Sequence, residues 1–152
     1  MRRDTLLDFF DDRIRSDRPF LVYDGGYRSY TWSYAEIRRA ARDFSERLRE
    51  HGLAPGDRVV LWGENRAEWI VALWGCLLAR AVAVPIDLRA SANLVERVVR
   101  IVSAPLVIAG RDLHPPDVDG VETWPLDDLL GDAGAPATPG TADHPSRDDL
   151  AE

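Results

Sequence analysis

Three short apolar runs constrain the fold of this chain more than any other feature of its sequence. They are RVVLW (58–62), AVAVP (81–85) and PLVIA (105–109). The segments between them, 66–80 and 91–103, have the length of helices. Continuous apolar strands joined by helical crossovers are typical of parallel strands that are covered on both faces. We therefore expect an α/β fold with a partial, mainly parallel sheet and helices on both of its faces.

The residues before the first apolar run predict a helix, a β-hairpin and a second helix. Apolar residues recur every four positions within 6–14, which indicates an amphipathic helix. The segment FLVYDGGYRSYTW (20–32) has two aromatic and β-branched arms around a glycine turn, as a hairpin does. Ser33 and Glu36 form the S-x-x-E capping box that opens a helix, here from about 34 to 50.

The end of the chain, from residue 121 on, differs from the rest in its predicted elements and its composition. VETW (121–124) predicts a weak strand, and LDDLL (126–130) predicts a short helix. The residues that follow are rich in proline, glycine and alanine and contain no aromatic residue, which is typical of a flexible linker. We therefore expect residues 1–130 to form the α/β part and residues 131–152 to form a linker.

The segment 69–88 is apolar enough to raise the question of a membrane span. Arg80 would lie near the middle of that span, at a cost of about 2.5–3.5 kcal/mol. Pro85 and Asp87 disfavour a span further. The same residues fit a helix over 66–80 that is apolar nearly all round, and therefore buried, followed by a buried strand.

Composition excludes several classes of function. A net charge of −7 disfavours nucleic acid and anionic membranes as main partners. The N-terminal MRRDTLLDFFDDR turns acidic where a secretory signal would be apolar, so we expect a cytoplasmic protein without a transmembrane segment. Cys76 is the single cysteine, which excludes an internal disulfide and a multi-cysteine metal site. The three histidines have no metal-ligand spacing, so we assign no metal-binding residue.

Nucleotide-binding motifs are missing from the sequence. It contains neither G-x-G-x-x-G after a strand nor G-x-x-x-x-G-K-[ST], and the glycines of YDGGYRS (23–29) are explained by a hairpin turn. All 19 basic residues are arginines, so the chain supplies no phosphate-loop lysine and no Schiff-base lysine. No serine lies in a G-x-S-x-G context. We therefore assign no catalytic residue.

Polar residues follow each of the three predicted strands. They lie in GEN (63–65), IDLR (86–89) and GRD (110–112). Ligands of parallel α/β sheets approach the carboxyl ends of the strands, so Asp87, Arg89, Arg111 and Asp112 are candidates for a ligand site. A solvated sheet rim with helix caps explains the same residues, and this is the interpretation that the residues alone favour. Periodicity and spacing alone give an α/β domain of undetermined function.

Two segments resemble the adenylate-forming superfamily, which contains acyl-CoA synthetases, luciferases and peptide-synthetase adenylation domains. YTWSYAEI (30–37) is similar to an early family segment, and GDRVVLWGENRAEWIVALWGCLLARAVAVPIDLR (56–89) is similar to the next signature. The pair Arg80-Ala81 departs from the family's usual Ala-Gly, which implies looser helix–strand packing. GENRAEW resembles the long-chain acyl-CoA synthetase branch, whereas VPID is shared with peptide-synthetase domains.

The resemblance implies a two-step ligase reaction that uses ATP, Mg²⁺ and coenzyme A. A carboxylic acid such as a fatty acid attacks the α-phosphate of ATP to give an acyl-adenylate and pyrophosphate, and the thiol of coenzyme A then takes the acyl group. In the family this chemistry belongs to a Ser/Thr/Gly-rich loop with a lysine, an aspartate on the ribose, and a lysine on a mobile C-terminal domain. SRDDLAE (146–152) resembles the approach to that loop. We therefore expect an N-terminal portion of an acyl-CoA synthetase that is inactive as an isolated chain and binds none of these cofactors tightly.

One family site falls within this sequence. By position, the resemblance implies that Asp87, Leu88, Arg89 and Arg111 lie at the periphery of the coenzyme A site. An arginine suits the 3′-phosphate of coenzyme A, because its guanidinium group donates two parallel charge-assisted hydrogen bonds.

Two other interpretations stay open. The chain could be a fragment of an amino-acid-activating adenylation domain, or a stand-alone non-catalytic module that binds a partner or regulates a synthetase. The coding sequence after Glu152 distinguishes a fragment from a module. In a module the sheet would be incomplete, and we expect its unpaired edge to self-associate or to be covered by a partner chain. The sequence leaves acyl chain length, oligomeric state and pathway open.

Overall fold

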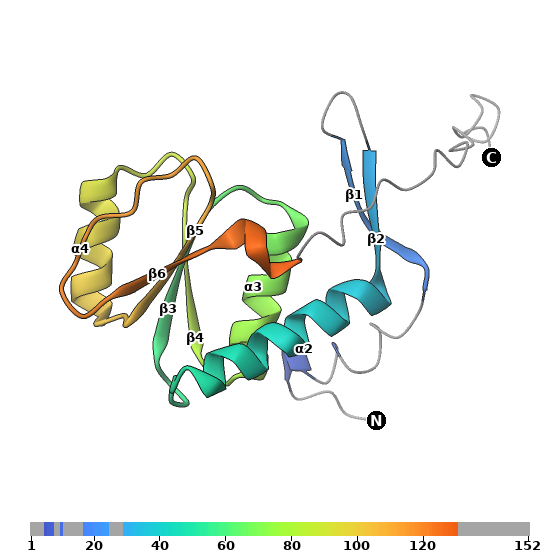
Figure 1. The fold of residues 1–152 in the computed structure, drawn as a ribbon, viewed down its shortest axis with the longest axis horizontal. Helices are drawn as coiled ribbons and strands as arrows, with labels where there is room; N and C mark the ends of the chain where they lie inside the picture. Colours follow the sequence, from blue (N-terminus) through green and yellow to red (C-terminus); the bar gives the residue numbers. More distant parts are fainter. Residues whose placement is uncertain (1–4, 8–9, 11–16, 25–28, 131–152) are drawn as a thin grey trace.

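The computed structural model describes residues 5–7, 10, 17–24 and 29–130, which Figure 1 draws in colour. The turn of the expected hairpin, most of the expected first helix and the expected linker (131–152) lie outside the described residues.

The fold combines a small antiparallel hairpin with a parallel sheet of four strands (Figure 1). The elements follow one another as β1 (Pro19–Asp24), β2 (Ser29–Ser33), α2 (Tyr34–Glu50), β3 (Arg58–Trp62), α3 (Ala67–Leu78), β4 (Val82–Ile86), α4 (Ala92–Val102), β5 (Leu106–Ala109), β6 (Glu122–Pro125) and the 3-10 helix η1 (Leu126–Leu129). Strands β1 and β2 pair with each other, and the sheet has the order β4-β3-β5-β6. The expected α/β class, the hairpin and the parallel sheet are confirmed.

The two faces of the sheet are covered by different helices, as the apolar runs predicted (Figure 1). Along β3, Val59 and Leu61 point into a core that they share with α2 and α3. Val60 and Trp62, which alternate with them, point into a second core that they share with α4. This alternation follows from the strand geometry, because successive side chains leave a strand on opposite faces.

Helix α2 begins at the predicted capping box. The Ser33 hydroxyl accepts a hydrogen bond from the Glu36 backbone N–H (3.2 Å), and the Glu36 carboxylate accepts one from the Ser33 N–H (2.7 Å). The hydrogen bond from the Ser33 backbone N–H lowers the pKa of Glu36 below its ordinary value. The buried stripe of the helix includes Ile37, Phe44 and Leu48, at the spacing that the sequence indicated.

Strand β4 corrects one prediction. Its apolar run indicated a buried strand, but β4 is the edge of the sheet among the described strands, and Val82 is 48% exposed. Pro85 is also exposed, which agrees with the restriction of proline to strand edges, since proline donates no hydrogen bond to a neighbouring strand.

One helical prediction also needs correction. Helix α3 is only partly buried: small residues such as Gly75 and Cys76 lie in its contact with α2 and the sheet, while Trp69 and Leu73 are half-exposed. The short helix expected at LDDLL is present as the 3-10 helix η1. None of the helices within the described residues is long and apolar enough to span a membrane.

Arg80 has a backbone conformation that disfavours arginine. It follows α3 with φ = 63°, in the left-handed region that glycine adopts without steric cost. Its side chain is exposed in the structure, whereas a membrane span over 69–88 would have placed it near the middle of that span. A Cβ in this region is crowded against the backbone, so arginine is strained at this position.

We expect the substitution Arg80→Gly to stabilise the protein by about 0.5–1 kcal/mol, because relief of the left-handed strain exceeds the entropic cost of glycine. Thermal unfolding followed by circular dichroism measures the change. Arg80→Ala is the matched control, since it removes the same side chain but keeps the Cβ. Equal stabilisation by both substitutions would show that the effect comes from the lost charge.

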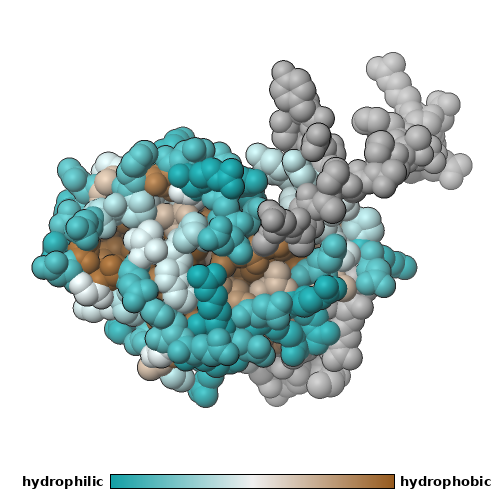
Figure 2. All heavy atoms as spheres, viewed as in Figure 1, coloured by the Kyte–Doolittle hydropathy of each residue, from teal (hydrophilic) through white to brown (hydrophobic). Residues whose placement is uncertain are grey.

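Figure 2 shows one face of the molecule, on which hydrophilic residues cover most of the described surface and hydrophobic residues appear between them. Exposed large apolar side chains among the described residues include Val22, Leu94 and Ile101. They come from the hairpin and from α4.

Candidate functional site

The carboxyl ends of the parallel strands meet at one edge of the sheet. Because β3, β4 and β5 run in the same direction, the polar segments that follow them emerge on the same side. A groove of about 490 Å³ lies there, lined by Gly63, Glu64, Asn65, Trp69, Pro85, Ile86, Asp87, Leu88 and Arg89. The structure therefore brings together the first two polar segments that the sequence singled out.

A smaller cavity of about 60 Å³ adjoins the groove, and the two share Glu64 and Leu88. Its remaining lining residues are Arg66, Glu68, Gly110, Arg111, Asp112, Leu113, Leu126 and Asp127. All four residues expected at the coenzyme A periphery thus lie along one continuous edge. Their assignment to that ligand is a proposal, which we take up below.

Asp87 and Arg89 form an ion pair with each other beside the groove. The Asp87 carboxylate accepts hydrogen bonds from the Arg89 backbone N–H (2.8 Å), from Nε (3.2 Å) and from Nη2 (3.3 Å). The side-chain hydrogen bonds from Arg89 lower the pKa of Asp87, and the same contact raises the pKa of Arg89. Both side chains are largely exposed, so the pair contributes little to stability.

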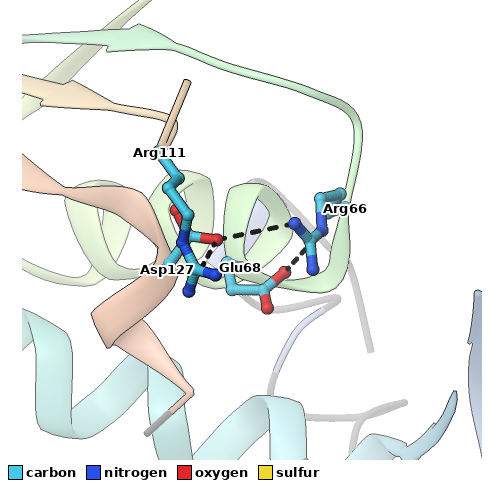
Figure 3. Close-up of polar contacts among 4 residues, drawn as sticks. All are labelled: Arg66, Glu68, Arg111 and Asp127. Atoms are coloured by element: carbon cyan, nitrogen blue, oxygen red, sulfur yellow. Dashed lines mark hydrogen bonds and ion pairs between the residues drawn. The ribbon is translucent and has the colours of Figure 1, made fainter. Parts of the chain in front are cut away.

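Arg111 belongs to a cluster with Arg66, Glu68 and Asp127, which Figure 3 shows in close-up. Its Nη2 lies 3.8 Å from Oδ1 of Asp127, and Nη1 of Arg66 lies 3.5 Å from the same oxygen. Arg66 also lies 3.7 Å from Glu68, through Nε and Oε2. Two guanidinium groups therefore share one carboxylate, and the second carboxylate of the cluster belongs to the first turn of α3.

The centre of this cluster was missed from the sequence. Asp127 was expected only as part of a short helix, yet it lies two residues after the end of β6, one strand farther along the same sheet edge. The rule that selected the polar residues after the other strands would have found it, had β6 been counted. Arg66 also lies over the ring of Tyr23, 5.1 Å from its centroid, and nothing in the sequence signals this contact with the hairpin.

Other sequence candidates lie away from this edge. Cys76 is buried in the core, where desolvation raises the pKa of its thiol to about 12, so it serves as a packing residue. Nε2 of His51 lies 3.3 Å from Oε2 of Glu122, and its ring meets the indole of Trp124 edge-on. Within the described ranges, no group of three or more His, Cys, Asp and Glu side chains could hold a metal ion.

The side chains along this edge are mainly charged and apolar. The residues that line the groove and the cavity include no serine, cysteine or histidine, so they offer no side-chain nucleophile with an adjacent base. They do include guanidinium groups and carboxylates, which suit the recognition of a charged or polar ligand.

Comparisons with known proteins identify the family of the chain. Residues 11–151 match the model of the AMP-binding enzyme family. Surfactin synthase subunit 2 of Bacillus subtilis (strain 168) is 29% identical over 92% of this chain and 4% of its own length. An octahydroindenyl-propanoyl:CoA ligase of Rhodococcus jostii (strain RHA1) is 33% identical over 60% of this chain and 18% of its own length. The chain therefore spans a small part of these relatives.

The solved N-terminal subdomain of NpsA from Klebsiella oxytoca has the same fold. It superposes with a TM-score of 0.70 at 20% identity, over 82% of this chain and 32% of the NpsA chain. The family match covers nearly all of this sequence, and the observed sheet, hairpin and helices agree with that subdomain. The chain belongs to the AMP-binding enzyme family.

Proposed function

We propose that this chain is the N-terminal portion of an ATP-dependent ligase that converts a fatty acid, ATP and coenzyme A into acyl-CoA, AMP and pyrophosphate through an acyl-adenylate. The observation that carries this proposal is the family match together with the groove at the carboxyl edge of the sheet. Similarity to a CoA ligase supports the choice of acceptor. We further propose that the protein acts in the cytoplasm.

The edge of the sheet is the proposed periphery of the coenzyme A site. Asp87, Leu88 and Arg89 line the groove, and Arg111 lies beside the adjoining cavity. The exposed arginines suit phosphate, and Leu88, which is 39% exposed, offers an apolar surface to a base. The fit is partial, because each arginine already faces an aspartate.

ATP and Mg²⁺ have no assigned ligands in this chain. Stabilising the charge that develops on the transferred phosphate requires cations and N–H donors aimed at it. The sequence has no lysine, and the described residues contain no cluster of metal-ligating side chains. We therefore propose that the isolated 152-residue chain forms no acyl-adenylate.

The test compares the complete polypeptide that contains these residues with the isolated 152-residue chain. Both are incubated with ATP, Mg²⁺ and a panel of short, medium and long fatty acids, and pyrophosphate release is measured. We expect fatty-acid-dependent release from the complete polypeptide and none from the isolated chain. Turnover by the isolated chain would contradict the proposed inactivity, and a complete polypeptide inactive with every carboxylic acid would point to a non-catalytic module.

A second candidate function has comparable support. Similarity to surfactin synthase subunit 2 over 92% of this chain favours an adenylation domain that activates an amino acid. The same pyrophosphate assay with a panel of amino acids distinguishes the two. Release that depends on an amino acid and not on any fatty acid would replace the first proposal by the second.

A further inference from the structure

We propose that strand β4 and the adjoining side of helix α4 form a two-fold interface with a second copy of this chain. The surface is a strip of apolar side chains, which we call the β4–α4 strip. Its members are Val82, Leu88, Leu94, Val98 and Ile101, of which Val98 is half-buried and the others are exposed. The inference concerns assembly, so it lies outside the proposed function and does not depend on it.

Helix α4 has more apolar surface than the sheet covers. It lies on the face of the sheet opposite α2 and α3 (Figure 1), with Val95 and Val99 buried in the core beneath it. Leu94, Val98 and Ile101 recur on the neighbouring side of the helix, and Ile101 is 78% exposed. Because β–α–β crossovers between parallel strands are right-handed, this side of α4 lies toward β4 and not toward β5.

Strand β4 continues the strip below the helix. Val82 and Val84 alternate with the residue between them, so they share the face of the sheet that α4 covers, and Val84 packs against the core there. Val82 is 48% exposed at the start of β4, at the end of the sheet where α4 finishes near Ile101. Leu88 follows β4 at the other end, where α4 begins near Leu94. The strip therefore runs along the whole open side of β4.

The backbone on the open side of β4 limits which strand can pair with it. The N–H of Val82 donates to the carbonyl oxygen of Asp57 (2.7 Å), so Val82 and the residues that alternate with it direct their N–H and C=O groups toward β3. Ala83 directs both groups to the open side instead. Pro85, the next residue on that side, has no N–H to donate. Within β4, a partner strand can therefore exchange a complete pair of hydrogen bonds only with Ala83.

A second copy meets this restriction when the two β4 strands run antiparallel and Ala83 lies opposite Ala83 of the second copy. The two alanines then exchange both hydrogen bonds, as the residues of a hydrogen-bonded antiparallel pair do. In this register Val82 lies opposite Val84 of the second copy, on the face that carries α4. Pro85 lies opposite Ala81, whose N–H is already engaged by the carbonyl oxygen of Cys76 (2.9 Å). The two α4 helices then face each other with their exposed apolar sides.

The charges at the ends of β4 favour the same antiparallel arrangement. Arg80 is exposed before the strand, and the Asp87 side chain is 61% exposed after it. Antiparallel pairing brings Arg80 of each copy near Asp87 of the other, whereas parallel pairing would bring like charges together. Asp87 also pairs with Arg89, so this contact contributes little affinity and mainly determines the orientation.

The interface is small, so the dimer is weak. Interfaces that bury less than about 1,200 Å² in total are typical of transient contacts. We therefore expect a dissociation constant of about 10–100 µM, and a monomer at about 1 µM. At the lower concentration Val84 lies at an open edge of the sheet.

Sedimentation velocity of the complete polypeptide that contains these residues, from about 1 to 300 µM, tests the interface. We expect a monomer at the low end of this range and a dimer at the high end. Ile101→Glu places a charge in the strip without disturbing the monomer, because that side chain is already 78% exposed. We expect it to raise the dissociation constant by at least about tenfold, since the carboxylate would lose water without gaining a partner.

Val22→Glu is the matched control. It places the same charge on an apolar side chain that is 69% exposed, on the hairpin strand β1 and not on the strip. We expect it to leave the dissociation constant unchanged. Circular dichroism at about 1 µM checks that each variant keeps the fold of the monomer.

A charge exchange tests whether the partner is a second copy in this register. Arg80→Asp alone and Asp87→Arg alone each place like charges at both ends of the interface, and we expect each to raise the dissociation constant by about fivefold. An equimolar mixture of the two variants restores both opposite-charge contacts in the mixed dimer. We expect that mixture to associate within about twofold of the unsubstituted protein.

Four results would overturn the inference. They are a monomer at every concentration, an unchanged dimer in Ile101→Glu, an equal loss in Val22→Glu, and a mixture that associates no better than its components. A complete polypeptide that stays monomeric would mean that water or another part of the polypeptide covers the strip.

Discussion

Gly75→Ala is expected to destabilise the protein by about 2 kcal/mol, although alanine normally favours a helix over glycine by about 1 kcal/mol. A Cβ at Gly75 would lie 2.3 Å from Cδ1 of Phe44 and 3.2 Å from the carbonyl oxygen of Ala41. The Phe44 ring is 3% exposed and packs in the core, so it cannot swing aside. The helices α2 and α3 would have to separate, and thermal or urea-induced unfolding measures the cost.

Gly63→Ala is the matched control for this prediction. A Cβ at Gly63 would also meet a neighbour closely, Cδ2 of Leu126 at 2.8 Å, but this overlap is smaller than at Gly75, and the nearest backbone atom, the nitrogen of Gly110, is 3.5 Å away. We expect this substitution to cost less than about 1 kcal/mol. The double variant Phe44→Leu/Gly75→Ala should recover part of the loss, because it removes the clashing ring. A Gly75→Ala protein as stable as the unsubstituted one would show that the helices do not cross closely at Gly75.

Local signals predicted the local structure well. The capping box at Ser33 and Glu36 predicted the start of α2, and its apolar stripe gave the buried face, because both depend on residues within one or two turns. The apolar runs predicted parallel strands for a similar reason: the length of a helical crossover leaves few other arrangements. These features need no knowledge of distant contacts.

Strand order and the partial exposure of α3 could not be predicted in the same way. The runs at β3 and β4 look equally apolar, yet only β3 lies between two other strands, and sequence composition does not record which neighbours a strand acquires. Similarly, the apolar surface of α3 gave no indication that Trp69 and Leu73 would be half-exposed. Burial in these cases depends on which elements pack against them, and that is a property of the tertiary fold.

In the candidate site, too, the sequence predicted which residues share an edge but not which of them contact one another. Asp87, Arg89 and Arg111 were found because residues after parallel strands share one edge of the sheet. The sequence could not show that Arg111 faces Asp127, or that Arg66 approaches the same carboxylate, since these residues lie far apart in the chain. The close pairing of Asp87 with Arg89 spans two residues, yet it depends on a turn geometry that the loop sequence alone does not dictate.

Val60→Ala is expected to lower the free energy of unfolding by about 2–3 kcal/mol, which combines the lost burial of the methyl groups with the cavity left behind. Val60 is fully buried in the centre of the sheet, in the core that faces α4. Its partner in the parallel register is Val84 on β4, which points into the same core but is only partly buried. Val84→Ala should therefore cost less than about 1 kcal/mol, because water already reaches that side chain and the strand edge can relax.

The two valines form a matched pair, since they are neighbours on the same face and lose the same atoms. Urea-induced unfolding of both variants and of the unsubstituted protein gives the two free-energy differences directly. In the order β4-β3-β5-β6, β3 is central and β4 is at the edge. We therefore expect Val60→Ala to lower the free energy of unfolding much more than Val84→Ala does. Equal losses would mean that β4 is covered in solution by a further strand or by a second copy of the chain, and the edge position assigned to it here would then be wrong for the assembled protein.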